Sequence, residues 1–536
     1  MDFAKNPYPA GRMPVMASHG MVATSQPLAA QAGLSMLQRG GNAVDAILAT
    51  AITLSVVEPT SNGIGSDAFA IVSDGQQLHG LNGSGRAPAS SSADALRAVG
   101  HTAMPQRGWH PVTVPGTPRM WADLHGRFGR LPFATVFEPA IWYAEQGFPV
   151  SPITAAGWQS AAAQTVAPFR NDPLFSPWFD VFAPGGHAPR AGETWRSPDH
   201  AATLRRIAAS NASDFYDGDT AEAIDRFARA TGGLLRGSDL AAHHSEWVDP
   251  IHTTYRGHDV WELPPNGWGI ATLLGLNILS ELPLRSHPRD TAEAYHLQIE
   301  SLKLAFADAR RYVADPAMSE VPVAGLLDPA YAAERRKLIG EGASNAVAGA
   351  PRRGGTVYLC AADGDGMMVS FIQSNYNGFG SGIVPPGTGV ALHNRGYGFT
   401  LEEGHPNELA PGKRPFHTII PGFLTRDGIP IGPFGVMGAF MQAQGHVQMI
   451  VNTLDYDLNP QASLDAPRWR FDHGTTIKIE PQTDAAIIDG LRQRGHTVEV
   501  DPALGNYGRG QIIWRLKDGN YVAGSDPRAD GAAIGF

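Results

Sequence analysis

The sequence contains a single cysteine, Cys360, among its 536 residues. One thiol cannot form an internal disulfide bond, and it excludes metal sites built from clusters of cysteine. The chain also lacks runs of lysine and arginine, and its formal net charge is −10. We therefore expect no nucleic acid partner, because electrostatic binding of phosphates needs a basic surface.

Long apolar stretches are scarce as well. The most hydrophobic one, residues 43–57, is too short to span a bilayer and contains Asp45. The first 20 residues include three prolines and no apolar segment of the kind found in secretory signals. We therefore expect a cytoplasmic protein without membrane contact.

The sequence does contain enough apolar material for a large folded domain. Hydrophobic residues make up 43% of the chain and charged residues 17%, which is typical of a globular protein with more than one core layer. The 62 glycines and 42 prolines are spread along the chain, which indicates many turns. We expect one composite domain or two intertwined ones, and the composition leaves a homo-oligomer open.

The most informative stretch surrounds the junction of Gly355 and Thr356. Residues 340–355 are rich in Gly, Ala, Ser and Arg, so we expect an exposed, mobile connector. After the junction, two β-favouring runs at 356–362 and 367–374 flank an Asp-Gly-Asp-Gly turn signal, which predicts a hairpin. The connector would thus deliver a hydroxyl residue to the first position of a buried strand.

Such a junction is what a self-cleaving enzyme with an N-terminal nucleophile requires. Gly355 tolerates backbone strain, so the hydroxyl of Thr356 could attack the carbonyl that precedes it. Cleavage would free the α-amino group of Thr356, which titrates near pH ~8 and can accept the proton of its own hydroxyl. On its own, a Gly-Gly-Thr tripeptide is more often an ordinary loop that enters a strand.

Periodicity elsewhere predicts strands and helices on both sides of the junction. Residues 43–57 are apolar almost all round, which is typical of a central helix covered on two sides. Strands, then helices, then strands favour an α+β fold arranged as a layered αββα sandwich. The main expected elements are strands at 20–24, 68–72, 77–81 and 390–393 and helices at 270–279, 292–314, 442–454 and 484–494.

Two further patterns have competing interpretations. His296 and Glu300 lie one helical turn apart, but without a second histidine a hydrogen bond on the helix surface is preferred over a metal pair, and no metal is predicted. The small-residue turn at Gly438 and Ala439 precedes a helix, so its backbone amides could stabilise an oxyanion or simply allow close packing.

Nine motifs occur in an order that is hard to obtain by chance. They are Gly20-Met21-Val22-Ala23-Thr24, Gly40-Gly41-Asn42-Ala43-Val44-Asp45-Ala46, Glu58-Pro59, Ser84-Gly85-Arg86-Ala87-Pro88, Val114-Pro115-Gly116-Thr117, Gly355-Thr356, Phe379-Gly380-Ser381-Gly382, Lys413-Arg414-Pro415 and Ser525-Asp526-Pro527-Arg528. With them the chain resembles the γ-glutamyltransferase family of N-terminal-nucleophile hydrolases over almost its whole length.

The resemblance implies a proenzyme with a four-layer αββα sandwich that cuts itself before Thr356. Residues 1–355 would become a large subunit and residues 356–536 a small one, and the two would remain in one composite fold. Thr356 would attack the carbonyl of an amide, usually a γ-glutamyl amide, and form an acyl-enzyme that water or an amine resolves. The resemblance implies no metal or organic cofactor.

Four residues take their expected roles from the resemblance. Ser374 would supply the second hydroxyl that hydrogen-bonds the nucleophile, and Arg86 would bind a substrate carboxylate. The consecutive amides of Gly438 and Ala439 would hold the oxyanion, where only backbone N–H groups are needed.

Other positions depart from the family's usual substrate clamp. Where relatives hold an α-amino group with amide and acidic side chains, this chain has Tyr376, Arg395 and Gly398. His417 and Thr418 replace a pair of serines. An ammonium group would meet Arg395 without a carboxylate partner, at a cost of roughly a few kcal/mol. These changes suggest an acyl donor that bears a carboxylate and no free amine.

The leading prediction is a self-processing amide hydrolase, with hydrolysis favoured over transfer. Its acyl donor would be small and carry a carboxylate, as γ-glutamyl compounds and glutathione do. Alternatives are an oxamate amidohydrolase, a glutaryl or cephalosporin acylase, and an unprocessed scaffold that binds small carboxylates without catalysis. A metal-dependent amidase is disfavoured because the histidines are scattered along the chain.

Overall fold

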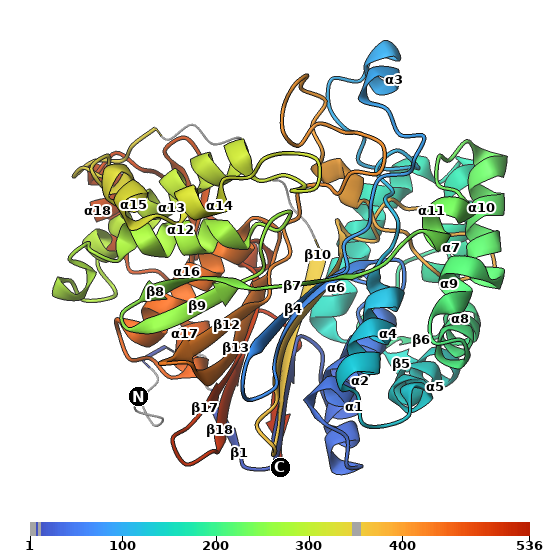
Figure 1. Cartoon of the computed structure of the whole chain (residues 1–536), viewed down its shortest axis with the longest axis horizontal. Helices are drawn as coiled ribbons and strands as arrows, with labels where there is room; N and C mark the ends of the chain where they lie inside the picture. The colour runs from blue at the N-terminus through green and yellow to red at the C-terminus, as the bar shows by residue number, and fades with distance from the viewer. Residues whose placement is uncertain (1–6, 9–11, 346–354) are drawn as a thin grey trace.

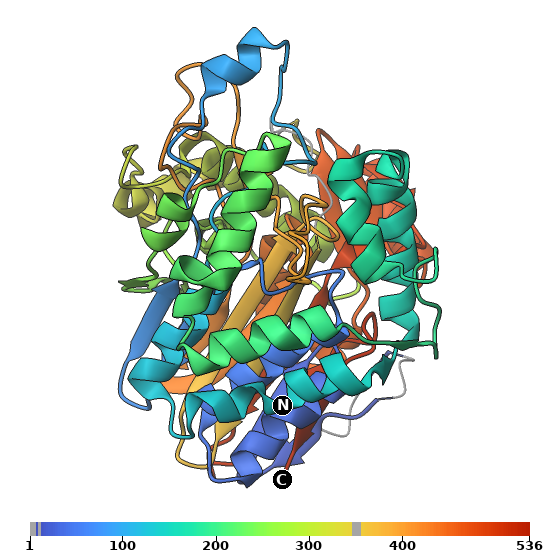
Figure 2. The ribbon, with the colours of Figure 1, turned by 90° about the vertical axis from the view of Figure 1, so that its right-hand side faces the viewer.

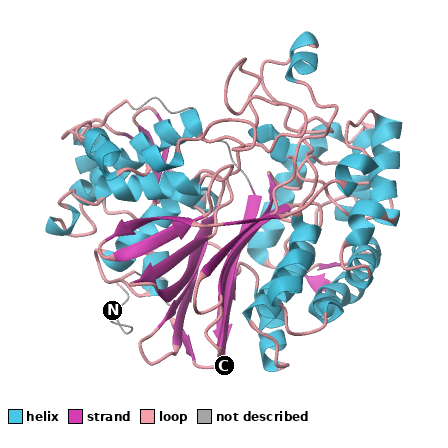
Figure 3. Ribbon diagram, in the orientation of Figure 1, coloured by secondary structure: helices cyan, strands magenta, loops and turns pink. Residues whose placement is uncertain are grey.

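Two seven-stranded sheets lie face to face in the middle of the molecule, and helices cover the outer face of each (Figures 1 and 3). The computed structural model describes residues 7–8, 12–345 and 355–536. The arrangement is a four-layer αββα sandwich of the α+β class, which confirms the predicted fold class.

The strands of both sheets come from distant parts of the chain, and all pairs within the two sheets are antiparallel. In order across the first sheet they are β19 (Ala532–Gly535), β2 (Gly20–Thr24), β10 (Gly355–Asp363), β11 (Met368–Tyr376), β3 (Asp67–Ser73), β4 (Leu78–Asn82) and β7 (Glu246–Val248). Across the second sheet they are β1 (Val15–Ala17), β18 (Tyr521–Ser525), β17 (Arg509–Arg515), β13 (Ile429–Met437), β12 (Gly422–Arg426), β9 (His258–Glu262) and β8 (Ile251–Tyr255). Each sheet therefore joins segments from before and after Thr356.

The outer face of the first sheet is covered by α2 (Ala43–Val57), all of whose residues are buried. This helix is apolar on every side because it packs on β10 and β11 on one side and on a second helix on the other. Asn42 and Asp45 begin it with a reciprocal capping box. Figure 2 looks onto this side of the molecule. The other helices here are α1 (Pro27–Gln38), α4 (Thr117–Phe128), α5 (Glu138–Gln146) and α8 (Pro198–Ala209).

The second sheet packs its outer face against α12 (Gly269–Leu279), α16 (Met441–Leu454) and α17 (Pro460–Asp465). Farther out lie α13 (Ala292–Tyr312) and α18 (Ala485–Gln493). The motif that ends in Arg528 is buried beside this sheet, where Arg528 Nη2 lies 2.5 Å from the Glu480 carboxylate. This motif therefore has a structural role, since its buried charge is paired.

Shorter elements complete the periphery. They are α3 (Ala93–Ala98), α6 (Pro152–Ala161), α7 (Ser176–Phe182), α9 (Ser213–Asp217), α10 (Asp219–Thr231), α11 (Gly237–Ala241), α14 (Val323–Leu326), α15 (Pro329–Arg336), the three-stranded sheet β14 (Trp469–His473), β15 (Thr476–Ile479) and β16 (Thr497–Val500), and the pair β5 (Phe148–Pro149) and β6 (Thr194–Trp195). No helix among the described residues is long and apolar enough to cross a membrane.

A third core lies between the two sheets and aligns them. It contains Tyr358 of β10, Phe69 of β3 and Met437 of β13. The ring of Tyr358 lies over Gly435, where an added Cβ would come within 2.4 Å of the ring. The start of β10 is therefore held against the end of β13, where only glycine leaves room for the aromatic ring.

Most of the expected elements are present within a few residues, but the strand at 390–393 is wrong. That segment is irregular and buried, and its backbone bonds to loops: the amide of His393 donates to the Gly65 carbonyl at 2.9 Å. The short apolar run Val390-Ala391-Leu392 therefore reflects burial rather than pairing in a sheet. Most of the expected mobile connector, residues 346–354, lies outside the described residues.

The contact of Tyr358 with Gly435 predicts a sensitive position. Gly435→Ala should lower the free energy of unfolding by about 1–3 kcal/mol, because the ring is buried and cannot swing away. Urea denaturation measures the loss. Gly126→Ala is the matched control, since Gly126 is exposed in α4 and an added Cβ there meets nothing within 4 Å. Equal stability of the two variants would contradict the packing role of Gly435.

Candidate active site

Thr356 occupies an irregularity at the start of β10. The pairing of β10 with β11 shifts register between Gly355 and Val357, so Thr356 lies in a bulge. A bulge re-aims a side chain relative to regular pairing. Here Thr356 Oγ1 lies 2.9 Å from Ser374 Oγ, and Thr356 is 1% exposed.

The Ser374 hydroxyl has a defined position. Its oxygen accepts hydrogen bonds from the backbone N–H of Tyr376 at 2.8 Å and from Arg395 Nη2 at 3.3 Å. These two donors fix the position of the Ser374 oxygen, and either hydroxyl can donate in its contact with Thr356 Oγ1. Tyr376 has a positive φ of 71°, a strained conformation for a residue with a side chain.

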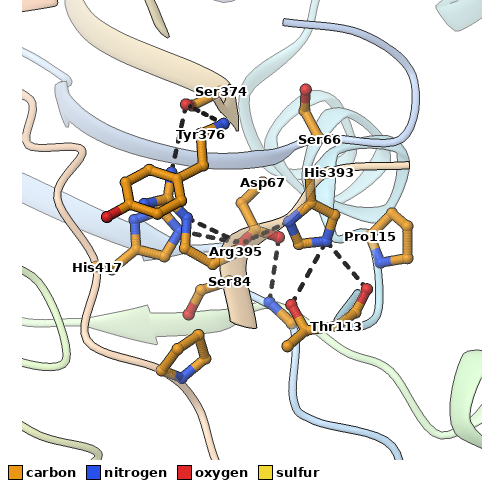
Figure 4. A network of polar contacts seen from close by, with 12 residues as sticks. Ser66, Asp67, Ser84, Thr113, Pro115, Ser374, Tyr376, His393, Arg395 and His417 are labelled. Atoms are coloured by element: carbon orange, nitrogen blue, oxygen red, sulfur yellow. Dashed lines mark hydrogen bonds and ion pairs between the residues drawn. The ribbon is translucent and has the colours of Figure 1, made fainter. Parts of the chain in front are cut away.

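Arg395 is a cation buried beneath these hydroxyls (Figure 4). Its Nη1 donates to Thr418 Oγ1 at 3.0 Å, and its Cζ lies 4.2 Å from the centre of the Tyr376 ring. Its Nε lies 3.9 Å from an oxygen of Asp67. The buried cation therefore has a carboxylate close by.

Asp67 is a member of the site that the sequence analysis missed. It is the first residue of β3 and lies directly opposite Ser374 in the pairing of β3 with β11. It is fully buried, accepts the Gly85 amide at 3.3 Å and lies 3.0 Å from His417 Nε2. Burial raises the pKa of Asp67 to about 7, although the charge of Arg395 opposes this shift. An acidic residue that opens an otherwise apolar strand was the signal available in the sequence.

Two histidines complete the surroundings of Asp67. His417 Nδ1 accepts the Ile419 amide at 3.4 Å, so its Nε2 carries the hydrogen and donates to Asp67. Burial, together with the charge of Arg395, lowers the pKa of His417 well below its usual range. Burial also lowers the pKa of His393, whose Nε2 lies 3.0 Å from the Thr113 carbonyl, to about 3. Both rings are therefore neutral near pH 7.

The turn at Gly438 and Ala439 connects β13 to α16. Both residues have positive φ angles, 131° for Gly438 and 52° for Ala439, and the second is strained because alanine has a side chain. Their carbonyls accept hydrogen bonds from the first turn of α16, whereas no described residue accepts one from either amide. These two amides are therefore available to another acceptor.

Arg86 is not brought together with the other expected site residues. Among the described residues, its guanidinium bonds Glu246 at 3.1 Å, Asp315 at 3.3 Å and the Gly412 carbonyl at 3.1 Å. It lines a cavity of about 320 Å³ next to His243. Its charge is thus already paired with two carboxylates. The link from this segment to Asp67 is the backbone amide of Gly85, which donates a hydrogen bond to the Asp67 carboxylate.

His296 and Glu300 are buried, so the expected position on a helix surface is wrong. Together with His496 their ligand atoms lie within 4.8 Å of one another. His296 Nδ1 instead lies 2.9 Å from His496 Nε2, and Lys303 Nζ lies 2.7 Å from the Glu300 carboxylate. These partners and the nearby ammonium make the cluster a hydrogen-bonded core group, and His496 supplies the second histidine that the local sequence pattern lacked.

Comparisons with known proteins agree across the chain. The sequence model of gamma-glutamyltranspeptidase matches residues 29–536. The glutathione hydrolase-like YwrD proenzyme of Bacillus subtilis is 36% identical, with 97% of this chain and 99% of that protein covered. The oxamate amidohydrolase proenzyme of Klebsiella pneumoniae is 33% identical, with 97% and 99% covered. The crystal structure of cephalosporin acylase from Bacillus halodurans is similar with a TM-score of 0.95 at 53% identity, covering 100% of this chain and 99% of that one.

The raised pKa of Asp67 predicts a pH dependence of stability. Between about pH 4 and pH 7 the native carboxyl keeps a proton that the unfolded chain releases, so this group stabilises the native state less as the pH rises. Asp67→Asn removes this effect. The melting temperature of the wild type minus that of the variant should therefore fall as the pH is raised from 5 to about 7. Calorimetry of both proteins measures it.

Asp427→Asn is the matched control, because Asp427 is 85% exposed in its side chain. The difference in melting temperature between the wild type and Asp427→Asn should not change over the same pH interval. A constant difference for Asp67→Asn would mean that Asp67 is ionised throughout this range.

Proposed function

Because this chain belongs to the gamma-glutamyltranspeptidase family, we propose that it is a proenzyme that cuts itself between Gly355 and Thr356 and then hydrolyses amides. The observation that carries this proposal is the 2.9 Å contact between Thr356 Oγ1 and Ser374 Oγ at a strand bulge beside Gly355. Residues 1–355 become the large subunit and residues 356–536 the small one.

The interleaved sheets support a processed enzyme that stays in one piece. After cleavage, β10 and β11 of the small subunit still pair with β2 and β3 of the large one. In the second sheet, β12 pairs with β9 in the same way. Ladder hydrogen bonds and three shared cores thus hold the subunits together without a covalent link.

In the proposed reaction the freed amine of Thr356 accepts the proton of its own hydroxyl, and the resulting oxygen nucleophile attacks the amide carbonyl. Ser374 donates its hydrogen bond to Thr356 Oγ1, which leaves the proton of Thr356 free to move to the amine. The amine then returns a proton to the leaving group, and a water molecule that it activates hydrolyses the acyl-enzyme. Each step uses groups of the chain and water.

The amides of Gly438 and Ala439 are proposed to bind the oxygen that becomes negative during attack. Their positive φ angles orient consecutive N–H groups in a fixed turn, and no described residue accepts a hydrogen bond from them. Donors that are oriented in advance stabilise developing charge without reorganisation. The contact of Tyr358 with Gly435 supports their placement next to Thr356.

Arg395 is proposed to act through Ser374 rather than through direct contact with substrate. It is fully buried, and its nitrogens contact Ser374, Thr418 and Asp67. A cation behind Ser374 makes that hydroxyl a stronger donor to Thr356, which favours the anionic form of the nucleophile. Asp67 limits the cost of burying the cation.

The proposed substrate is an amide whose acyl group bears a carboxylate and no free amine, with hydrolysis favoured over transfer. A cephalosporin acylase and an oxamate amidohydrolase are among the similar proteins. Release of acid from a panel of glutaryl amides, oxamate and glutathione discriminates these substrate classes.

Thr356→Ala should leave the full-length chain uncut, because the residue supplies both nucleophile and base. Denaturing gels after prolonged incubation should show two bands for the wild type, with threonine first in the smaller, and one band for the variant. Amide hydrolysis should fall by about 10³-fold or more.

Thr497→Ala, at an exposed position of β16, is the control and should be processed normally. Two bands from Thr356→Ala would place the cleaving group elsewhere. A wild type that stays whole and hydrolyses no amide would favour the binding scaffold instead.

Arg395→Met should lower kcat by about 10- to 100-fold and change KM by less than about threefold, because it removes a charged hydrogen bond to Ser374 and not to substrate. Steady-state kinetics of the processed variant measures both constants. Arg426→Met, an exposed position, is the control. A raised KM with unchanged kcat would instead place Arg395 against the substrate, as the sequence analysis expected.

A further inference from the structure

Arg310 is a cation beside the proposed oxyanion turn. It lies in the last turn of α13, and its Cζ is 5.0 Å from the centre of the Phe440 ring. Phe440 directly follows Ala439 in the chain. The charge of Arg310 also acts on Tyr376, whose ring covers Arg395. Arg310 is therefore close to both sides of the proposed reaction centre.

Apart from the ring of Phe440, the guanidinium of Arg310 has no partner among the described residues. Its Nε and Nη2 are buried without a hydrogen-bond acceptor, and it forms no ion pair with a carboxylate of these residues. The segment 346–354, which precedes the junction, contains no aspartate or glutamate. Burial lowers the pKa of Arg310 to about 10, because its surroundings do not compensate the charge.

Arg310 thus differs from the two arginines that the sequence analysis selected. Arg86 is paired with two carboxylates, and the guanidinium of Arg395 contacts Ser374, Thr418 and Asp67. A buried donor without an acceptor destabilises the folded protein, and does so more when it is charged. An anion supplied from outside the protein would remove that destabilisation.

A purely structural explanation accounts for only part of this arrangement. A basic residue in the last turn of α13 interacts favourably with the helix dipole. The neighbouring Arg311 also lies in that turn and is exposed to solvent, where this interaction needs no burial. The dipole therefore does not explain why the donors of Arg310 are turned inward beside Phe440.

We propose that Arg310 binds the carboxylate of the acyl donor, so that the substrates are half-amides of short dicarboxylic acids. This inference rests on the proposed function, in which the amides of Gly438 and Ala439 hold the carbonyl oxygen. The acyl chain then runs from that oxygen past Phe440 to Arg310. Trp268 and Phe416 pack around Phe440 and make an apolar wall suited to a few methylene groups.

A matched pair of substrates isolates the carboxylate. Glutaryl-p-nitroanilide and 4-carbamoylbutanoyl-p-nitroanilide share the leaving group and the chain length and differ only in carboxylate against amide. Arg310→Gln should lower kcat/KM for the glutaryl compound by about 10- to 100-fold and for the amide compound by less than about threefold. Arg311→Gln, the exposed neighbour, should change neither.

Equal losses for both anilides, or no loss for the glutaryl compound, would overturn the assignment. Titration calorimetry with free glutarate gives a second readout that needs no catalysis: binding to the processed wild type should weaken at least about tenfold in Arg310→Gln. Wild-type protein that binds no glutarate would also overturn it. Gels report self-cleavage separately, and Arg310→Gln should still be cut, so failure of the proposed function is recognised independently.

Discussion

The buried pairing of Arg395 with Asp67 is the interaction on which the site depends. Neither residue is exposed, and each would be an uncompensated interior charge without the other. Arg395 also contacts Ser374, so the pair connects the first residue of β3 to the hydroxyl that directs Thr356. The neutral histidines around Asp67 add hydrogen bonds without adding charge. Nucleophile position and local electrostatics are thus set by one network.

The fold explains why a chain could be cut at this point and still keep its site. Thr356 lies at the start of a strand inside a sheet, and residues before the junction provide the strands on either side of the hairpin. The candidate site includes strained backbone: the bulge at Thr356 and the positive φ angles of Tyr376 and Ala439. The surrounding cores stabilise these conformations, because close-packed layers resist relaxation.

Local patterns in the sequence were sufficient for the hairpin after Gly355, the apolar helix α2 and the small-residue turn before α16, since each depends on neighbouring residues. They failed at 390–393, where a short apolar run is buried in a loop and not in a strand. Asp67 and Arg310 were not selected, because nothing within a few residues of either shows what it faces. The surface position expected for His296 was wrong for the same reason.

The sequence by itself determined the layered α+β fold and a hydroxyl residue behind glycine at the start of a buried strand, because strand, turn and helix signals are local. The tertiary structure alone decided which charges are paired. Arg86 and Arg395 pair with carboxylates from segments far away in the chain, whereas Arg310 pairs with no carboxylate among the described residues. Pairing of charges depends on which distant residues the packed layers bring together, and that information is not local.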